Sequence, residues 1–143
     1  MMAKSLFIVI VGCGRLGSHL ANGLSAQGHG VVVIDLRPEA FAALDAQFSG
    51  FKLVGDAVES EVLRQARLDQ ADLLLAVAEE DNVNLMVAQV GQKVFAVPRV
   101  MARVADPARE EAYRQFGIQT VCPTTLAGEA LLATLGRSGE ARR

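Results

Sequence analysis

Short apolar runs of strand length alternate along the chain with segments in which apolar residues recur every three or four positions. The runs at Leu6–Val11, Val31–Asp35 and Leu73–Val77 are almost continuously apolar, which is typical of strands buried on both faces of a sheet. The whole pattern predicts six strands, at Leu6–Val11, Val31–Asp35, Phe51–Val54, Leu73–Val77, Val97–Val104 and Ile118–Val121. It predicts helices at Arg15–Gln27, Pro38–Phe48, Glu59–Gln65, Val83–Gly91, Pro107–Phe116 and Thr125–Leu135.

Turn and cap residues agree with these boundaries. Gly28 follows the first predicted helix, where a capping glycine is expected, and Pro38 and Pro107 stand at helix starts. Strands that alternate with helices favour parallel pairing through right-handed crossovers. The sequence therefore predicts an α/β fold in a single domain, with a Rossmann-type doubly wound sheet of six parallel strands.

Composition narrows the classes of function. The chain has 143 residues, of which 51% are hydrophobic, as expected for one globular domain. A net charge of −2 argues against nucleic acid as the main partner. The apolar runs are far shorter than the roughly 20 residues that span a bilayer, and the start MMAKSL lacks the features of a signal peptide. We therefore expect a cytoplasmic protein with no direct membrane insertion.

The two cysteines offer no metal or disulfide chemistry. Cys13 and Cys122 stand alone, without CxxC spacing or a neighbouring cluster of histidines. We interpret both as small buried hydrophobic residues and predict no metal site.

A glycine motif follows the first predicted strand and opens the first predicted helix, which is the context that gives GxGxxG its meaning. In the run Gly12-Cys13-Gly14-Arg15-Leu16-Gly17, the first glycine permits a tight turn. The second lets the backbone approach a pyrophosphate, and the third lets the helix pack closely on the strand. The anion would then lie on the free N–H groups at the positive end of the helix dipole.

An acid ends the second predicted strand. Asp35 stands where a carboxylate accepts hydrogen bonds from an adenosine ribose, and it would repel a 2′-phosphate, which disfavours NADP. Arg37, two residues on, is a cation that weakens this argument against NADP. The alternative is that Asp35 only starts the turn before Pro38 and that the glycines only serve packing.

Arg15 lies in the first helical turn, where a cation opposes the helix dipole. The position becomes favourable if phosphates lie there and the guanidinium binds them. The alternative is a side chain turned out to solvent.

Three further segments follow predicted strands and should reach the same edge. In Gly55-Asp56-Ala57, Asp56 either faces the adenine or forms a capping box with Glu59. Asp81 and Asn84 are predicted to cap the next helix. Arg99 and Arg103 should point to one face of the fifth strand, where one could reach a phosphate, although a surface ion pair is the favoured interpretation.

We find no catalytic set. Tyr113 is not followed by the lysine of a YxxxK pair, and His19 and His29 lie in or just after the first helix, away from the predicted ligand edge. The sequence thus predicts a binding site without a reaction.

The chain resembles the KTN domain, also called the RCK N-terminal or TrkA-N domain, of regulatory proteins of potassium channels and potassium uptake (Trk/Ktr-type) systems. The resemblance runs from about Lys4 to Leu135. It rests on the linked blocks VGCGRLGSHLANGL with GHGVVVID, GDAVESEVLRQARLDQADLLLAVAEEDNVNL and ARVADPAREEAYRQFGIQTV.

This resemblance implies a cytosolic regulatory subunit, not an enzyme, that binds NAD(H) or ATP/ADP and controls a potassium channel or transporter membrane subunit at the inner face of the membrane. It implies a homodimer that can assemble into a larger ring. Residues 1–137 would form the nucleotide-binding domain and residues 138–143 a polar tail. The alternative function is an NAD-dependent oxidoreductase fragment that lacks its substrate domain.

Carried onto this sequence, the resemblance assigns the phosphates to the glycine loop and Arg15, the ribose to Asp35, and the adenine to the segment around Asp56. The full set of candidate cofactor-binding residues is Gly12, Cys13, Gly14, Arg15, Leu16, Gly17, Asp35, Leu36, Arg37, Asp56, Ala57 and Arg103.

Two departures from the family pattern stand out. Many members continue into a second RCK domain, so we expect a stand-alone form or a truncated one. Some members carry a metal-binding glutamate after the proline that follows the last strand, where this chain has Thr124 after Pro123.

Overall fold

The computed structural model describes residues 4–141, and side chains as far as residue 137. Its centre is a six-stranded parallel sheet, as the sequence predicted, and the strand order is β3-β2-β1-β4-β5-β6. The strands are β1 Phe7–Val11, β2 Gly30–Asp35, β3 Phe51–Val54, β4 Leu73–Ala76, β5 Arg99–Arg103 and β6 Gln119–Val121. The α-helices are α1 Arg15–Ala26, α2 Ser60–Gln65, α3 Asp81–Lys93, α4 Glu110–Gln115 and α5 Pro123–Ala141. Short 3₁₀ turns η1, η2 and η3 span Pro38–Ala43, Leu68–Gln70 and Pro107–Arg109.

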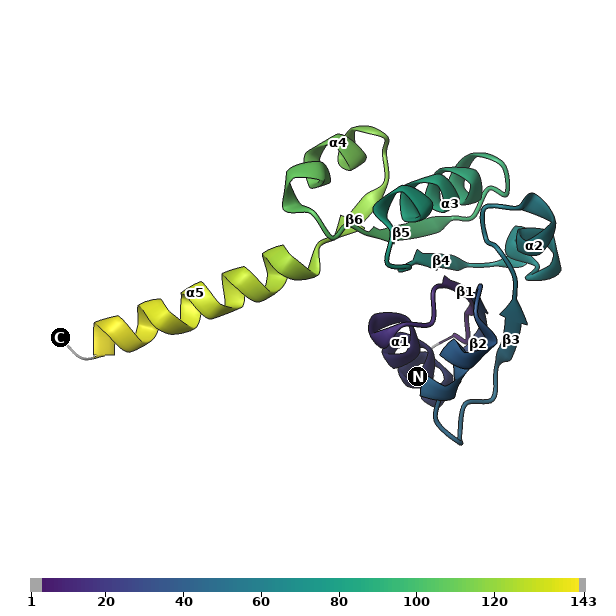
Figure 1. Cartoon of the computed structure of the whole chain (residues 1–143), viewed down its shortest axis with the longest axis horizontal. Coiled ribbons are helices and arrows are strands. Elements are labelled where there is room, and N and C mark those ends of the chain that lie inside the picture. Colours follow the sequence, from purple (N-terminus) through teal and green to yellow (C-terminus); the bar gives the residue numbers. More distant parts are fainter. Residues whose placement is uncertain (1–3, 142–143) are drawn as a thin grey trace.

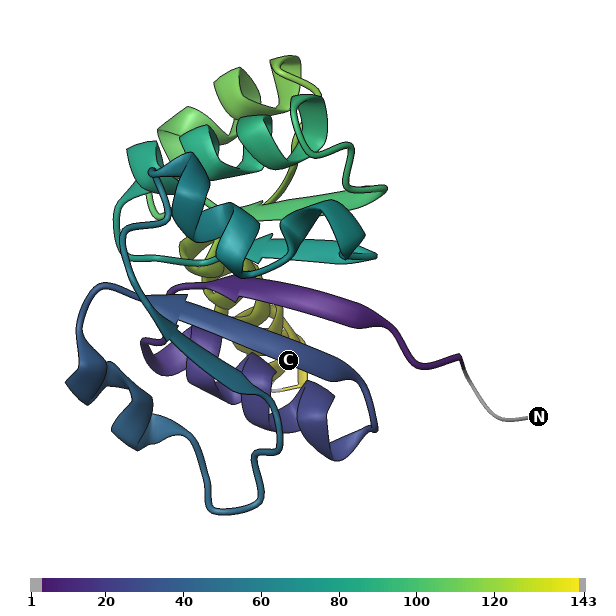
Figure 2. The same cartoon turned by 90° about the vertical axis from the view of Figure 1, so that its right-hand side faces the viewer.

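The sheet is covered on both faces, which explains why its central strands are apolar throughout. Alternate residues of β1 point to opposite faces: Val9 and Val11 pack with α2 and α3, while Ile8 and Ile10 pack with α1 and η1. The two layers are visible in Figure 2, with α1 on one side of the strands and α2 and α3 on the other. Each fully buried side chain of this kind contributes about 1.5–3 kcal/mol, so the two cores fix the strand ends that form the ligand edge.

One predicted helix was largely wrong. The segment Pro38–Phe48 forms only the 3₁₀ turn η1, which ends at Ala43. Beyond it Asp45 turns the chain, because its carboxylate accepts a hydrogen bond from the N–H of Gln47 at 3.0 Å and its own N–H donates to Oδ1 of Asn22 at 3.0 Å. An aspartate that bonds its own backbone two residues on favours a turn over a helix.

The fifth strand is shorter than predicted, and the helix after it is divided. The β5 strand begins at Arg99, because Ala96 has a positive φ of 54° and Pro98 donates no ladder hydrogen bond. The predicted helix Pro107–Phe116 is split into η3 and α4.

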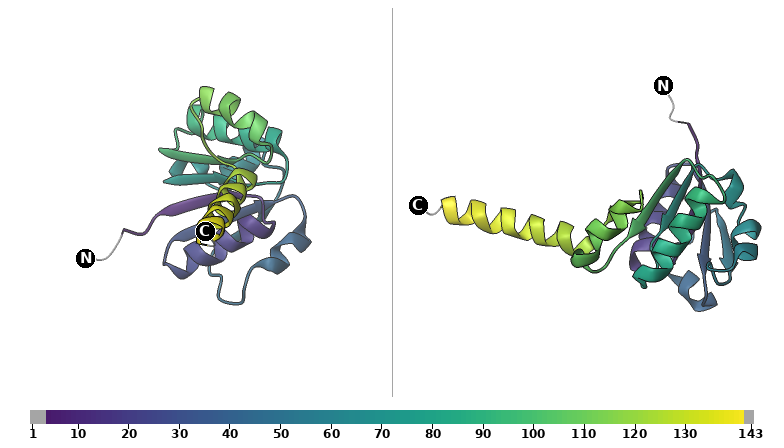
Figure 3. Two further views of the ribbon diagram at one scale, coloured as in Figure 1. Left: turned by 90° about the vertical axis from the view of Figure 1, so that its left-hand side faces the viewer. Right: turned by 90° about the horizontal axis from the view of Figure 1, so that it is seen from above.

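The last helix leaves the body of the molecule. Figure 1 shows α5 extending away from the sheet, and Figure 3 shows it as a single rod from two further directions. It is longer than predicted and begins at Pro123 directly after β6. The helix includes residues 138–141 of the predicted polar tail, whose side chains are outside the description, and residues 142–143 lie outside the described residues. The domain boundary at residue 137 remains a prediction.

Candidate functional site

A crevice with a volume of about 320 Å³ lies at the carboxyl ends of the first four strands. It is the place where ligands bind in open α/β sheets, beside the point at which the strand order reverses between β1 and β4. Eight predicted site residues line it: Gly12, Cys13, Gly14, Asp35, Leu36, Arg37, Asp56 and Ala57. The remaining four, Arg15, Leu16, Gly17 and Arg103, lie nearby without lining it.

Gly12 makes the turn between β1 and α1. Its φ is +104°, a value that side chains other than glycine rarely adopt. A Cβ here would lie 2.7 Å from the Cα and N of Ala78, so the loop touches the end of β4 directly. The N–H of Gly12 also donates to the carbonyl of Ile34 at 2.8 Å. The glycine therefore holds the loop against both neighbouring strands.

Gly17 and Gly14 differ in what surrounds them. A Cβ on Gly17 would overlap the carbonyl of Gly12, so α1 packs on the loop with no space between them. A Cβ on Gly14 would meet no described protein atom within 4 Å. Gly14 is exposed beside the crevice, so this space is open to a ligand.

The start of α1 presents unpaired hydrogen-bond donors. Within the described residues, the backbone N–H groups of Gly14, Arg15, Leu16 and Gly17 donate to no protein group. The first turn also contains no acidic residue. Free N–H groups and the positive end of the helix dipole together make an anion site.

Asp35 starts the turn before Pro38, as one of the two interpretations of the sequence predicted, and it also lines the crevice. Its carboxylate accepts hydrogen bonds from the N–H of Cys13 at 2.8 Å and the N–H of Arg37 at 2.9 Å. It therefore ties β2 to the glycine loop and starts the turn before Pro38. An ionised carboxylate has about four acceptor positions, so the crevice-lining group can also accept from a ligand hydroxyl.

Cys13 is a buried side chain with an exposed fraction of 2%. Burial raises the pKa of its thiol, and the negative charge of Asp35 raises it further. The thiol is therefore protonated at neutral pH and unsuited to nucleophilic attack. This agrees with the prediction of a small hydrophobic residue.

Asp56 lies in the crevice and forms no capping box. Its Oδ1 accepts from the N–H of Val58 at 3.1 Å, and α2 begins only at Ser60, with Glu59 as an N-cap that makes no side-chain hydrogen bond. The capping-box interpretation was wrong, because the chain makes a turn before the helix starts.

The end of β4 is fixed by buried side chains that were also misassigned. Asn84 is fully buried; its Oδ1 accepts from the N–H of Ala78 at 2.8 Å, and its Nδ2 donates to the carbonyls of Ala78 at 2.8 Å and Arg103 at 3.1 Å. The carboxylate of Asp81 accepts from the N–H groups of Ala105 at 2.7 Å and Asp106 at 3.3 Å. Neither residue caps α3, whose N-cap is Glu80. Both instead join the ends of β4 and β5.

Arg103 also bonds to backbone. Its guanidinium donates to the carbonyls of Ala78 at 3.1 Å and Glu79 at 3.3 Å. The predicted surface ion pair was wrong, because neither Arg99 nor Arg103 pairs with a carboxylate in the part of the chain that the structure describes.

Other residues stand outside the crevice or were missed. Arg15 is exposed at the first turn of α1, and Leu16 beside it is partly buried. Glu79 and Glu80 were not among the predicted site residues, and they line the crevice together with Ala78 and Val83. Their position after a buried strand was the available signal.

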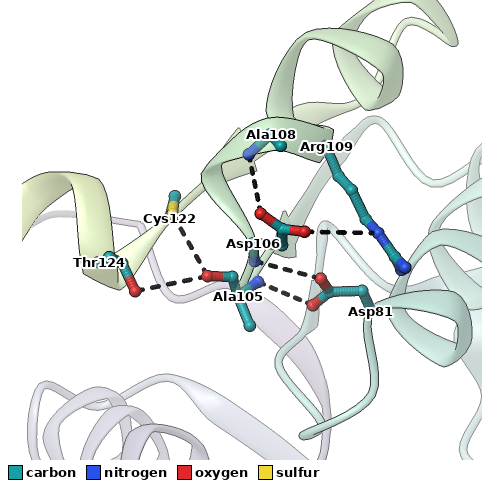
Figure 4. A network of polar contacts seen from close by, with 7 residues as sticks. All are labelled: Asp81, Ala105, Asp106, Ala108, Arg109, Cys122 and Thr124. Carbon is teal, nitrogen blue, oxygen red and sulfur yellow. Dashed lines mark hydrogen bonds and ion pairs between the residues drawn. The ribbon is translucent and has the colours of Figure 1, made fainter.

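A set of polar contacts joins Asp81, in the first turn of α3, to the root of α5 (Figure 4). The carbonyl of Ala105, whose N–H is bound by Asp81, accepts from the thiol of Cys122 at 3.9 Å and the hydroxyl of Thr124 at 3.4 Å. Asp106 accepts from the N–H of Ala108 at 3.0 Å and faces Arg109 at 3.9 Å. The loop after β5 therefore contacts both α3 and α5.

Strand order, glycine loop and crevice together define a Rossmann-type nucleotide-binding fold. The model of the TrkA-N domain family matches residues 8–124, and the chain belongs to this family. It is homologous to Trk potassium uptake proteins. Among residues 4–141, no helix has the length and apolar character needed to cross a membrane.

Several known proteins are similar to this chain. It is 40% identical over 134 residues to the Trk system potassium uptake protein TrkA of Streptomyces coelicolor, covering 94% of this chain and 60% of that protein. The GsuK RCK domain matches with a TM-score of 0.81 at 21% identity, covering 97% of this chain and 30% of that one. GsuK structures bound to NAD and to ADP match at TM-scores of 0.75 and 0.68. The AMP-bound Kef C-terminal domain of Shewanella denitrificans has a TM-score of 0.76 at 25% identity, covering 91% of this chain and 82% of that one.

Proposed function

We propose that this chain is the nucleotide-sensing part of a potassium uptake or potassium channel regulator. The observation that carries the proposal is the run of four N–H groups at the start of α1 that have no partner among the described residues, beside a crevice lined by the acid that ends β2. Membership in the TrkA-N family supports the potassium-transport setting. The chain spans about 60% of the length of the TrkA relative from Streptomyces.

The ligand is an adenine nucleotide, either NAD(H) or ATP/ADP. The phosphates lie on the N–H groups of Gly14–Gly17, and Asp35 accepts from the ribose. The adenine lies beside Asp56 and Ala57, with Leu36 and Arg37 along the other wall. Similar folds in complexes with AMP, ADP and NAD support this choice. Arg15 is exposed next to the same N–H groups and binds phosphate, in this copy or in a neighbouring one.

The helix α5 supplies the assembly surface. Its leucines are exposed: Leu126 by 56%, Leu131 by 64%, Leu132 by 70% and Leu135 by 67%. Leu131 and Leu132 lie four and three residues before Leu135, so the three share one side of the helix. A stripe of this kind favours a second copy of the chain as its partner, which gives a homodimer and allows a larger ring.

Nucleotide binding controls the membrane partner through this assembly. The segment Ala78–Glu80 lines the crevice, Asp81 binds the loop after β5, and that loop binds the root of α5. A nucleotide that binds one arrangement of these elements more tightly than the other shifts the dimer geometry. The protein acts in the cytoplasm, held at the inner face of the membrane by a potassium channel or transporter subunit.

Calorimetric titration with ATP, ADP, NAD and NADH, each paired with light scattering for molecular mass, tests the proposal. We expect binding with nucleotide-dependent affinity and a dimer or larger assembly. Replacing Leu131 and Leu132 with Asp should lower the mass to that of a monomer and retain nucleotide binding. Binding of NAD(H) alone without any assembly would contradict the sensor and favour an oxidoreductase fragment.

Arg15→Ala tests the proposed phosphate contact separately. We expect it to weaken ATP binding more than adenosine binding, because only ATP presents phosphates to the guanidinium. Equal losses for both ligands would contradict this role.

A further inference from the structure

The crevice carries an excess of negative charge. Four of its lining residues are acidic, Asp35, Asp56, Glu79 and Glu80, and one, Arg37, is basic. The carboxylates of Asp35 and Asp56 bind backbone N–H groups. Those of Glu79 and Glu80 are exposed and have no hydrogen bond or ion pair within the described residues. These two charges are therefore available to act on a ligand.

Glu79 and Glu80 lie on the far side of the phosphate loop from Asp35. The strand order places β2 on one side of β1 and β4 on the other. Ala78, directly before Glu79, is the residue whose backbone would lie 2.7 Å from a Cβ on Gly12. A dinucleotide in a doubly wound sheet crosses this point, so its second nucleoside falls on the β4 side. A mononucleotide places its outer phosphates toward the same side.

A role confined to α3 does not account for both glutamates. Acids favour the amino end of a helix, but α3 already has Asp81 in its first turn, and Glu80 makes no side-chain cap. The guanidinium of Arg103 is near, bound to the carbonyls of Ala78 and Glu79. Its single positive charge offsets one of the two carboxylates and leaves a negative excess.

We propose that Glu79 and Glu80 make the crevice selective for ligand charge, which rests on the proposed nucleotide site. They favour a dinucleotide whose second base is a cation, as the oxidised nicotinamide ring is, over its neutral reduced form. They disfavour each additional phosphate of a mononucleotide, in the order AMP, ADP and ATP. The site then reports the oxidised cofactor or the least phosphorylated nucleotide.

The double variant Glu79→Gln, Glu80→Gln tests this selectivity on the whole chain. Calorimetric titrations with NAD⁺, NADH, AMP and ATP, with a chelator present, measure each affinity. We expect NAD⁺ to bind about three- to tenfold more weakly and ATP about three- to tenfold more tightly, with NADH changing least. The shifts should shrink in 0.5 M salt, since screening acts over roughly 10 Å or less.

Opposite changes for two ligands separate charge selection from simple damage to the site. Asp69→Asn in η2 is the matched control, because it removes one exposed carboxylate before β4, away from the crevice, and should alter no affinity. Equal losses for all four ligands, or no change, would overturn the charge selectivity and leave the nucleotide site intact. A wild-type chain that binds none of the four would overturn the nucleotide site itself, and the selectivity with it.

Discussion

The two halves of the sheet's carboxyl edge use their polar groups differently. At the β1 and β2 ends, glycines keep side chains away and the N–H groups of Gly14–Gly17 remain unpaired within the described residues. Around β4 and β5, Asn84, Asp81 and Arg103 bind the main chain and connect one loop to the next. A strand end is open to a ligand only where the protein's own side chains have left its main chain free.

The largest effect on stability should come from adding a side chain at Gly12 in the glycine loop. Gly12→Ala places a Cβ against Ala78 at a positive φ, and we expect it to lower the free energy of unfolding by about 2–4 kcal/mol. Urea denaturation measures this change. Gly23→Ala, inside α1 with no described atom within 4 Å of the added Cβ, is the control and should stabilise the chain by about 0.5–1 kcal/mol. Similar losses at both positions would refute the special role of the loop.

Removing a side chain that connects the ends of β4 and β5 should lower stability nearly as much. Asn84→Ala leaves the N–H of Ala78 without its partner and removes one of the two side-chain donors to the carbonyl of Ala78, the other being Arg103. We expect this to destabilise the fold by about 2–3 kcal/mol. Thermal and urea unfolding measure the loss. Gln92→Ala removes an exposed side-chain hydrogen bond to the carbonyl of Gly117 and should cost less than about 0.5 kcal/mol. A loss of stability for Asn84→Ala no larger than that for Gln92→Ala would mean that the hydrogen bonds of Asn84 contribute little.

A substitution in the glycine loop with a smaller effect on stability separates nucleotide binding from folding. Gly14→Ala adds a methyl group where no described protein atom lies, at an ordinary φ of −78°. Stability should stay within about 1 kcal/mol of wild type, whereas nucleotide affinity should fall about tenfold or more as the methyl group meets the phosphates. Unchanged affinity in calorimetry would place the phosphates elsewhere.

The smallest effect concerns pH at the root of α5. The hydroxyl of Thr125 donates to Glu110 at 2.6 Å and lowers the pKa of that carboxyl from its ordinary 4.5, with help from Arg114. A lowered folded-state pKa adds stability above pH 4.5 that is lost as the pH falls through the lower folded-state value. Thr125→Val should therefore reduce stability at neutral pH, and the difference from wild type should shrink in acid.

Urea unfolding at several pH values between 7 and 3 measures this difference. Thr134→Val, whose hydroxyl bonds only the carbonyl of Ala130 among the described groups, should show no such pH dependence. A difference that stays constant with pH would argue against the contact with Glu110.

The sequence predicted the fold and the residues at the ends of β1 and β2 better than those at the ends of β4 and β5. The glycines and the acid that ends β2 act through backbone conformation and main-chain contacts, and their spacing along the chain reflects this directly. Asn84 and Asp81 act on residues some twenty positions later, at Arg103 and Ala105. Such partners are joined only when β4 and β5 pair, so local capping rules assigned both residues wrongly. The leucines of α5 likewise predicted a helix, but not that this helix extends away from the sheet.

The length of α5 determines how far its free end would move if the helix tilted at its start. At 19 residues and about 1.5 Å of rise per residue, α5 is about 28 Å long. It is held at one end, by Thr124 and Thr125, while its far leucines are exposed. A tilt of about 10° at that anchor would sweep the far end through about 5 Å, the height of one helical turn. With this geometry, a small shift beside β5 would become a displacement of the far end large enough to change which side chains meet there.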